Sequence, residues 1–302
     1  MSHNLPDWFI PKFRDAYKLR GEQKKRRLDG LAEEGGMFIG DDCHFPRFGQ
    51  AETTKSSRLQ ELIMQQVPLD WVKIAAEPEF VSFGIWDPDK KKLNISMANA
   101  FAGAAVRSVN RARDRQHIDA LRLAATNGVT NTKGQTENII TIGDYDTVVD
   151  LETICDAIVR LAEDEMFEGE SVSVISPFKV RMNMSLDPYL AKRDMKENRP
   201  WDEVNWRGYE RLPGNGANGA GWTAAGATGV DLFVHAKSAV MTVANDEDTE
   251  INERLGSRMG DLIGRWFQTA SGVVEPKGVI RIRSKLDFEL FRRAIPIIDT
   301  SE

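Results

Sequence analysis

Residues 95–126, ISMANAFAGAAVRSVNRARDRQHIDALRLAAT, are the stretch that most constrains the fold of this chain. The stretch has no proline and a single glycine, Gly103, and it is rich in Ala, Leu, Arg and Met, which are good helix formers. At a rise of 1.5 Å per residue it predicts one helix roughly 45–50 Å long, several times the usual length. We therefore expect the rest of the chain to pack along one long spine.

The apolar positions of this helix do not form one continuous stripe. The first half has one apolar face, made of Phe101, Ala105, Val109 and Ala112. The second half has another on nearly the opposite side, made of Ile118, Leu121 and Ala125. A polar waist separates the two, made of Arg111, Arg113, Asp114 and Arg115. A helix whose buried face changes halfway is expected to pack against two different structures.

Composition places the chain among soluble globular proteins. Its 302 residues are 41% apolar and 28% charged, which allows one elaborate domain or two small ones. The net charge of −6 gives no strong overall attraction to nucleic acid or membranes. Cys43 and Cys155 are far apart, so we expect a reducing compartment and no disulfide framework. The sequence shows neither a secretion signal nor a membrane span, and a cytoplasmic site of synthesis is expected.

The regions on either side of the spine have different patterns. Residues 1–28 form a basic arm, with eight Lys or Arg between Lys12 and Arg27. This arm could lie on a neighbour, face nucleic acid or be a solvated helical face. Residues 29–86 have short apolar pieces and many turn signals, and they predict an extended hairpin that lies on another structure.

Beyond the spine the sequence predicts a small α/β unit and closing strands. A strand at 138–142 precedes a helix capped by Asp146 or Thr147, and strand 171–176 leads to a further helix that starts at Ser176-Pro177. The predicted stripe of the first helix is Leu151, Ile154, Cys155, Ile158, Leu161 and Ala162. The segment 187–229 is rich in glycine and tryptophan. The closing strands are predicted to form a hairpin around Pro276 and Gly278.

A search for catalytic motifs yields nothing that the local context supports. Residues 214–219 fit G-x-G-x-x-G, but Leu212-Pro213 precedes them where a nucleotide site needs a strand, so a flexible loop is predicted. The metal-capable side chains of residues 41–44 have no second ligand pair at zinc spacing. His117 is interpreted as part of a solvated face or of a hydrogen bond between helices. We predict no catalytic residues, no cofactor and no metal.

The order of segments resembles the major capsid proteins of tailed bacteriophages, which share the Hong Kong 97 capsid fold. Three stretches carry the resemblance. The first is residues 86–89 leading into the spine, with 113–121 near its end, where a group of phage capsid proteins has a similar Arg-x-x-Asp, apolar, Ala-Leu pattern. The second is 147–176, a helix followed by a strand that ends Val-Ile-Ser-Pro. The third is 233–240 together with the closing Val-Val-Glu-Pro-Lys-Gly-Val-Ile-Arg-Ile segment.

The resemblance implies an α+β fold with the following parts: an N-terminal arm at 1–28, an extended loop at 29–86, a peripheral domain with the spine helix at 87–130, an axial domain at 131–239, and C-terminal strands at 240–302 that complete the peripheral domain. It implies a non-enzymatic protein that self-assembles through hexamers and pentamers into the icosahedral head shell around double-stranded DNA. The shell would belong to the virion and be assembled in the host bacterial cytoplasm. Expected partners are a portal, separate scaffolding and decoration proteins, and packaged DNA bound non-specifically, but no membrane. The chain begins directly with the arm, and scaffolding is therefore expected from a separate protein.

Two alternatives remain open at this point. One is a nanocompartment shell of the same fold, similar to the encapsulins. The other is a nucleotide-dependent enzyme that uses the 214–219 loop.

We also predict one contact between subunits. The basic end of the arm and its aromatic tip are expected to lie near the acidic run of a neighbouring subunit. The arm residues are Trp8, Phe9, Phe13, Lys24, Lys25, Arg26 and Arg27, and the acidic residues are Asp246, Glu247, Asp248, Glu250 and Glu253. An exposed ion pair contributes only about 0–1 kcal/mol, so the aromatic residues would supply most of the affinity. The competing interpretation is that the arm faces packaged DNA.

Overall fold

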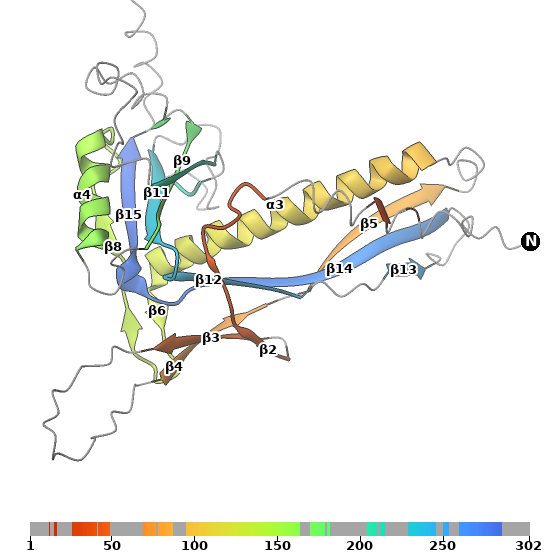
Figure 1. Ribbon diagram of the computed structural model, residues 1–302, viewed down its shortest axis with the longest axis horizontal. Coiled ribbons are helices and arrows are strands. Elements are labelled where there is room, and N and C mark those ends of the chain that lie inside the picture. The colour runs from red at the N-terminus through yellow and green to blue at the C-terminus, as the bar shows by residue number, and fades with distance from the viewer. Residues whose placement is uncertain are drawn as a thin grey trace, which may run out of the picture.

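A single long helix runs across the molecule (Figure 1). The computed structural model describes residues 12, 15–16, 26–40, 42–48, 69–76, 78–86, 95–163, 170–178, 180–181, 204–209, 212–214, 229–245, 250–253 and 260–285. The helix is α3 (Ile95–Asn127), which confirms the predicted spine to within one residue. Sheets lie along its first half and around its C-terminal end.

The spine ends where a glycine forces it to end. Gly128 has a φ of 73°, in the left-handed region, and it donates its N–H to the carbonyl of Ala124 at 3.0 Å. A Cβ at Gly128 would lie 2.6 Å from Asn138 Oδ1 and 2.8 Å from the backbone oxygen of Glu137. Both the backbone conformation and the space around it therefore require glycine.

The first half of α3 packs on a sheet organised around its longest strand. The strands of this β14 sheet are β1 (Glu33–Glu34), β5 (Pro78–Trp86), β12 (Val240–Asn245), β13 (Glu250–Glu253) and β14 (Gly260–Val273). Strand β14 pairs antiparallel with β12, β13 and β5, and β1 pairs parallel with β12. The rings of Phe101 on α3 and Phe83 on β5 lie 5.6 Å apart. At mid-helix, Gln116 donates to Glu79 on β5 at 2.7 Å and accepts from Thr269 on β14.

A second five-stranded sheet lies at the C-terminal end of the spine. The strands of this β11 sheet are β8 (Ile140–Ile142), β9 (Val172–Ser176), β10 (Asn205–Gly208), β11 (Gly229–Ala236) and β15 (Val279–Lys285). Their order is β10-β9-β11-β15-β8, and α4 (Leu151–Ala162) contacts β11. Every residue of β9 and β11 is buried, because both faces of these central strands are covered.

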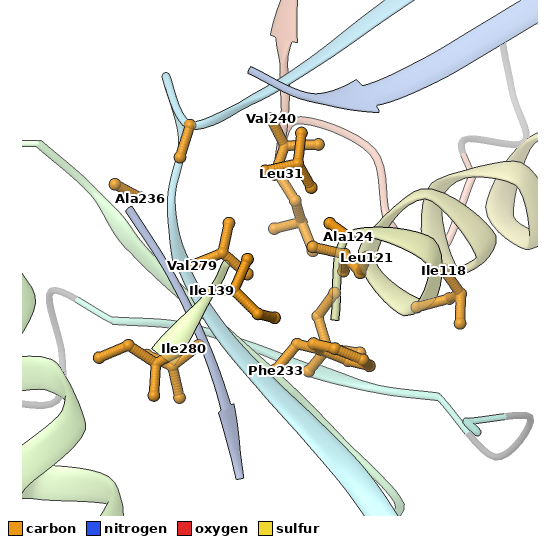
Figure 2. Close-up of a cluster of buried hydrophobic side chains, with 14 of the residues drawn as sticks. Leu31, Ile118, Leu121, Ala124, Ile139, Phe233, Ala236, Val240, Val279 and Ile280 are labelled. Atoms are coloured by element: carbon orange, nitrogen blue, oxygen red, sulfur yellow. The ribbon is translucent and has the colours of Figure 1, made fainter. Parts of the chain in front are cut away.

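The second half of α3 packs into the main hydrophobic core beside the β11 sheet. Figure 2 shows Ile118, Leu121 and Ala124 of the helix facing Phe233 of β11. The core also includes Leu31, Ile139, Val240, Val279 and Ile280, which come from four separate segments of the chain. The two halves of the spine therefore do pack against two different structures.

The change of buried face is smaller than the sequence predicted. The buried positions of the first half are Ala102, Ala105, Val106 and Val109, and those of the second are Ile118, Ala120, Leu121 and Ala124. Ala102 and Ala120 are eighteen residues apart, which is five full turns, so both lie on the same line of the helix. The buried face turns by about a quarter of a revolution, and the prediction of nearly opposite faces was wrong.

A three-stranded hairpin sheet projects from the region below the spine (Figure 1). It consists of β2 (Met37–Ile39), β3 (Asp42–Phe48) and β4 (Leu69–Ala75), all antiparallel in the order β2-β3-β4. A small ribbon of β6 (Val129–Thr130) and β7 (Thr136–Glu137) follows the spine. The predicted hairpin in 29–86 is present, but Cys43, Phe45 and Val72 belong to the main core. It is therefore part of the body of the protein as well as an extension from it.

Two local predictions need correction. The N-cap of α4 is Asp150, which accepts the N–H of Thr153 at 2.9 Å, rather than Asp146 or Thr147. Asp144 instead closes the preceding turn by accepting the N–H groups of Asp146 and Thr147.

The closing strands do not form a hairpin. A short 3-10 helix at Pro276–Gly278 separates β14 from β15, and the two strands lie in different sheets. Before this turn, the N–H groups of Val274 and Glu275 both donate to the carbonyl of Ala239. The C-terminal strands, which we expected to complete one peripheral unit, are thus divided between the β14 sheet and the β11 sheet.

Candidate assembly surfaces

The end of the basic arm is fixed to the waist of the spine by a buried carboxylate. Asp114 of α3 is only 4% exposed, and its two oxygens accept the backbone N–H groups of Arg27 and Leu28, each at 3.3 Å. Burial raises the pKa of Asp114, while the two N–H donors lower it. Leu28 itself is buried in the main core. The sequence placed Asp114 in the polar waist but gave no sign of this role.

The predicted inter-subunit residues fall mostly outside the described part of the chain. Trp8, Phe9, Phe13, Lys24, Lys25, Asp246, Glu247 and Asp248 all lie outside the described residues. Glu250 and Glu253 lie in β13, paired with Arg265 and Leu262 of β14. Arg26 forms an ion pair with Asp29 at 3.3 Å, and Arg27 donates its backbone N–H to the spine. The contact between the arm and the acidic run of a neighbour stays a prediction.

The hairpin sheet has two apolar faces, and only one of them is buried. Cys43, Phe45 and Val72 point into the core. On the outer face Met37 and Ile39 of β2 are 54% and 55% exposed, and Leu69 of β4 is 48% exposed. Met37, Ile39 and Leu69 pair with His44, Asp42 and Phe48 of β3. These partners are separated by even numbers of residues, so the three side chains lie on one face of the sheet.

This outer face has a few partners within the subunit. Trp71 is half-buried, and its ring lies 6.4 Å from that of His44. Asp42 and Lys73 form an ion pair at 2.6 Å between the strands. Strand β2 also stands at the edge of the sheet. An apolar face beside an edge strand, on a sheet that projects from the body, is the arrangement of a surface that a partner covers.

A single arginine holds the base of the hairpin sheet to the rest of the subunit. Arg47 on β3 donates from Nε and Nη2 to Glu275, at 2.9 and 3.0 Å, and from Nη2 and Nη1 to Glu137 on β7, at 2.8 and 3.3 Å. The guanidinium therefore binds two carboxylates, each through two hydrogen bonds. The adjacent carboxylates raise its pKa, although burial alone would lower it. No sequence motif marks this group, because its members are far apart along the chain.

The structure supports no catalytic or metal-binding role for the described residues that the sequence search considered. Cys43 is buried on β3, and burial raises its pKa to about 11, which keeps it a thiol. The described residues hold no group of three or more His, Cys, Asp or Glu that could bind a metal ion. Most of the 214–219 loop lies outside the described residues. At Gly214 a Cβ would lie 2.2 Å from the carbonyl oxygen of Gly229, so this glycine serves close backbone packing. Among the helices described, none is long and apolar enough to cross a membrane.

A buried histidine pair joins the spine to the β11 sheet. The rings of His117 on α3 and His235 on β11 lie 5.6 Å apart, and both are buried. His235 donates from Nδ1 to the carbonyl of Ala236 at 3.1 Å. Burial lowers the pKa of His235 to about 4 and that of His117 well below its usual value. The interpretation of His117 as solvated or bonded between helices was therefore wrong.

Comparison with known protein families gives a match over most of the chain. The family model described as "Phage capsid protein" matches residues 5–197. The chain belongs to the phage capsid protein family. It is a capsid shell protein, as the resemblance implied, and this family is one of structural proteins. No curated protein sequence matches this capsid protein.

Solved structures confirm the predicted α+β capsid fold for this capsid protein. The capsid of cyanophage P-SCSP1u aligns with a TM-score of 0.56 and 16% identity, over 86% of this chain and 88% of its own. The capsid of Ralstonia phage GP4 aligns with a TM-score of 0.55 and 9% identity, over 87% and 92%. A virus-like particle from Pyrococcus furiosus aligns with a TM-score of 0.54 and 11% identity, over 92% and 100%. The fold thus occurs in more than one kind of shell, and the family match assigns this chain to phage capsids.

Proposed function

We propose that this protein is the major subunit of a tailed-phage head, which self-assembles through pentamers and hexamers into an icosahedral shell around double-stranded DNA. Its role is structural rather than catalytic. Assembly takes place in the host cytoplasm, with a portal and separate scaffolding and decoration proteins as partners. The division into arm, extended loop, peripheral domain and axial domain remains part of this proposal.

The observation that supports self-assembly best is the exposed outer face of the hairpin sheet. Large apolar side chains that share one exposed face of a sheet mark a candidate surface for a partner. Here Met37, Ile39 and Leu69 are each about half exposed on one face of a projecting sheet. Arg47 fixes the base of that sheet, so the face is presented at a defined angle rather than on a loose loop. Covering this face with a neighbouring copy would remove its apolar area from water, at about 25 cal/mol per Å².

The experiment compares the wild-type chain with a variant of the outer face. The variant combines Met37→Ser, Ile39→Thr and Leu69→Thr, which leave the core untouched. A matched control is Leu123→Ser, which removes an apolar side chain that is also 48% exposed, but on α3. The wild type and the control should form pentamers, hexamers or hollow shells in electron micrographs, and the outer-face variant should remain a folded subunit.

Two results would count against the proposal. A wild-type chain that stays a 34 kDa monomer at high concentration would overturn the shell function. If the outer-face variant assembles as the wild type does, the hairpin sheet is not the assembly surface.

A further inference from the structure

The solvent face in the middle of the spine carries a row of arginines. Arg107, Arg111 and Arg115 are exposed and follow one another at intervals of four residues, so they lie on one ridge of α3. We call these three residues the arginine ridge. The Nε of Arg111 donates to the carbonyl of Arg107 at 3.1 Å, which lays the side chain of Arg111 along the ridge. From the rise of an α-helix, the ridge extends over roughly 12 Å.

The carboxylates of the spine do not offset this positive charge. Helix α3 contains two acidic residues, Asp114 and Asp119. Asp114 is buried and accepts backbone N–H groups of the arm, and Asp119 forms an ion pair with Arg122 at 3.3 Å. Among the described residues of α3, the exposed charged side chains are therefore all arginines. The ridge is a local positive surface on a chain whose net charge is −6.

The end of the arm brings a further exposed arginine to the same part of the spine. Arg27 is exposed, and its backbone N–H donates to Asp114 at 3.3 Å. In the helix, Asp114 lies between Arg111 and Arg115 of the ridge. The hydrogen bond that fixes the arm therefore also concentrates positive charge at the ridge.

The arginine ridge lies away from the surface through which we expect subunits to assemble. Ala105 and Val109 are buried where this part of α3 packs on the β14 sheet, and the ridge is on the opposite side of the helix. Figure 1 shows the spine and the hairpin sheet on opposite sides of β14. A neighbour that covers the outer face of the hairpin sheet therefore leaves the ridge open to a different partner.

We propose that the arginine ridge binds the phosphate backbone of duplex DNA, independently of base sequence. Duplex DNA carries one negative charge per about 1.7 Å of its axis, so a length equal to that of the ridge presents about seven phosphates. Each guanidinium can bind a phosphate through two parallel hydrogen bonds and keeps its charge throughout the physiological pH range. This contact rests on the shell function proposed above, because that function supplies the enclosed DNA.

Three variants of the full chain test the contact. The ridge variant removes the three charges and keeps good helix formers: Arg107→Gln, Arg111→Gln and Arg115→Gln. The lysine variant keeps the charges: Arg107→Lys, Arg111→Lys and Arg115→Lys. The control variant has the same charge change as the ridge variant, at exposed positions outside α3: Lys133→Gln, Lys237→Gln and Lys277→Gln. Each variant should melt within a few degrees of the wild type.

The salt dependence of DNA binding is the measurement that decides. Unassembled subunits are titrated into a short fluorescent DNA duplex at several salt concentrations, and anisotropy gives the Kd. The slope of log Kd against log salt concentration should be smaller by about 2–3 in the ridge variant than in the wild type, because each lost phosphate contact removes about 0.9. The control and lysine variants should keep the wild-type slope. Polyglutamate should displace the duplex only in large excess, because it carries its charges further apart.

The other outcomes overturn the proposal. A wild type that binds no duplex at low salt, or a ridge variant with the wild-type slope, refutes the contact. An equal loss of slope in the control variant would assign the binding to overall charge. If polyglutamate displaces the duplex at an equal concentration of charge, the ridge is a site for an acidic protein and not for DNA. Electron microscopy of shells formed by the same wild-type sample tests the shell function separately, so that either proposal can fail without the other.

Discussion

The guanidinium of Arg47 lies against the carboxylate of Glu275, a residue 228 positions further along the chain, through hydrogen bonds of 2.9 and 3.0 Å. Glu275 lies between the β14 and β11 sheets, so this pair joins the base of the hairpin sheet to the junction of the two larger ones. The position of the exposed outer face therefore depends on a contact that only the complete fold can form.

Replacing Arg47 should destabilise the subunit more than removing one of its partners does. Arg47→Ala leaves Glu275, whose side chain is 9% exposed, as a nearly buried charge without its cation, and should cost about 3–5 kcal/mol. Glu137→Gln should cost less than about 1 kcal/mol, because the side chain of Glu137 is 41% exposed. Urea unfolding measures both losses. Equal losses would show that the contact with Glu137, rather than that with Glu275, accounts for the effect of Arg47.

Removing the carboxylate of Asp114 should weaken the junction of arm and spine. Asp114→Ala leaves the backbone N–H groups of Arg27 and Leu28 without their acceptors, and each buried donor costs about 1–3 kcal/mol. The control is Asp119→Ala on the same helix, where an ion pair with Arg122 is partly exposed and contributes about 0–1 kcal/mol. Amide hydrogen exchange should show faster exchange at residues 27–31 only in the first variant. Unchanged exchange there would mean that Asp114 does not hold the junction.

The buried histidine pair should make the subunit less stable in acid. The pKa values of His117 and His235 are lower in the folded protein than the ordinary value of 6.5, so the unfolded chain binds more protons. Their contribution is complete above pH 6.5 and is lost as the pH falls toward about 4, the value for His235. Melting temperatures between pH 7.5 and 4.5 should fall less steeply in His235→Gln than in the wild type. If His235→Gln keeps the wild-type slope, the pair is not responsible.

A methyl group at Gly128 should destabilise the end of the spine. Gly128→Ala must hold a φ of 73° and place its Cβ within 3 Å of three atoms, and should cost more than about 1 kcal/mol. Gly30→Ala is the matched control because Gly30 has a φ of 77° but nothing within 4 Å of the added Cβ. Thermal unfolding should separate the two variants. Equal losses would assign the whole effect to the backbone conformation.

Local sequence could predict the spine but not the contacts that hold it. A run without proline, followed by Gly128, defines α3 from neighbouring residues alone, and the strong stripe of α4 does the same. The role of Asp114 depends on Leu28, 86 positions away, and no local pattern records it. The sequence around Pro276 correctly predicted that the chain turns there. It wrongly predicted a hairpin, because a turn does not determine with which strand the following strand pairs.

The hairpin sheet was predicted only in part for a related reason. Both of its faces are apolar, so alternation could not show which face is buried. A hairpin that only lay on another structure could lose residues 35–49 and leave a folded subunit. With Phe45 fully buried in the main core, we now expect this deletion to unfold it.

The pairing of β5 with β14 has a consequence for protein synthesis. Trp86 on β5 pairs with Gly260 on β14, a residue that is synthesised much later. The first half of the spine packs on β14, so this packing cannot form until almost the whole chain has left the ribosome. A nascent chain therefore cannot complete the β14 sheet on which its spine packs. We expect polysomes to carry no assembled shells. Late pairing of the strands ensures that only finished chains enter a growing particle.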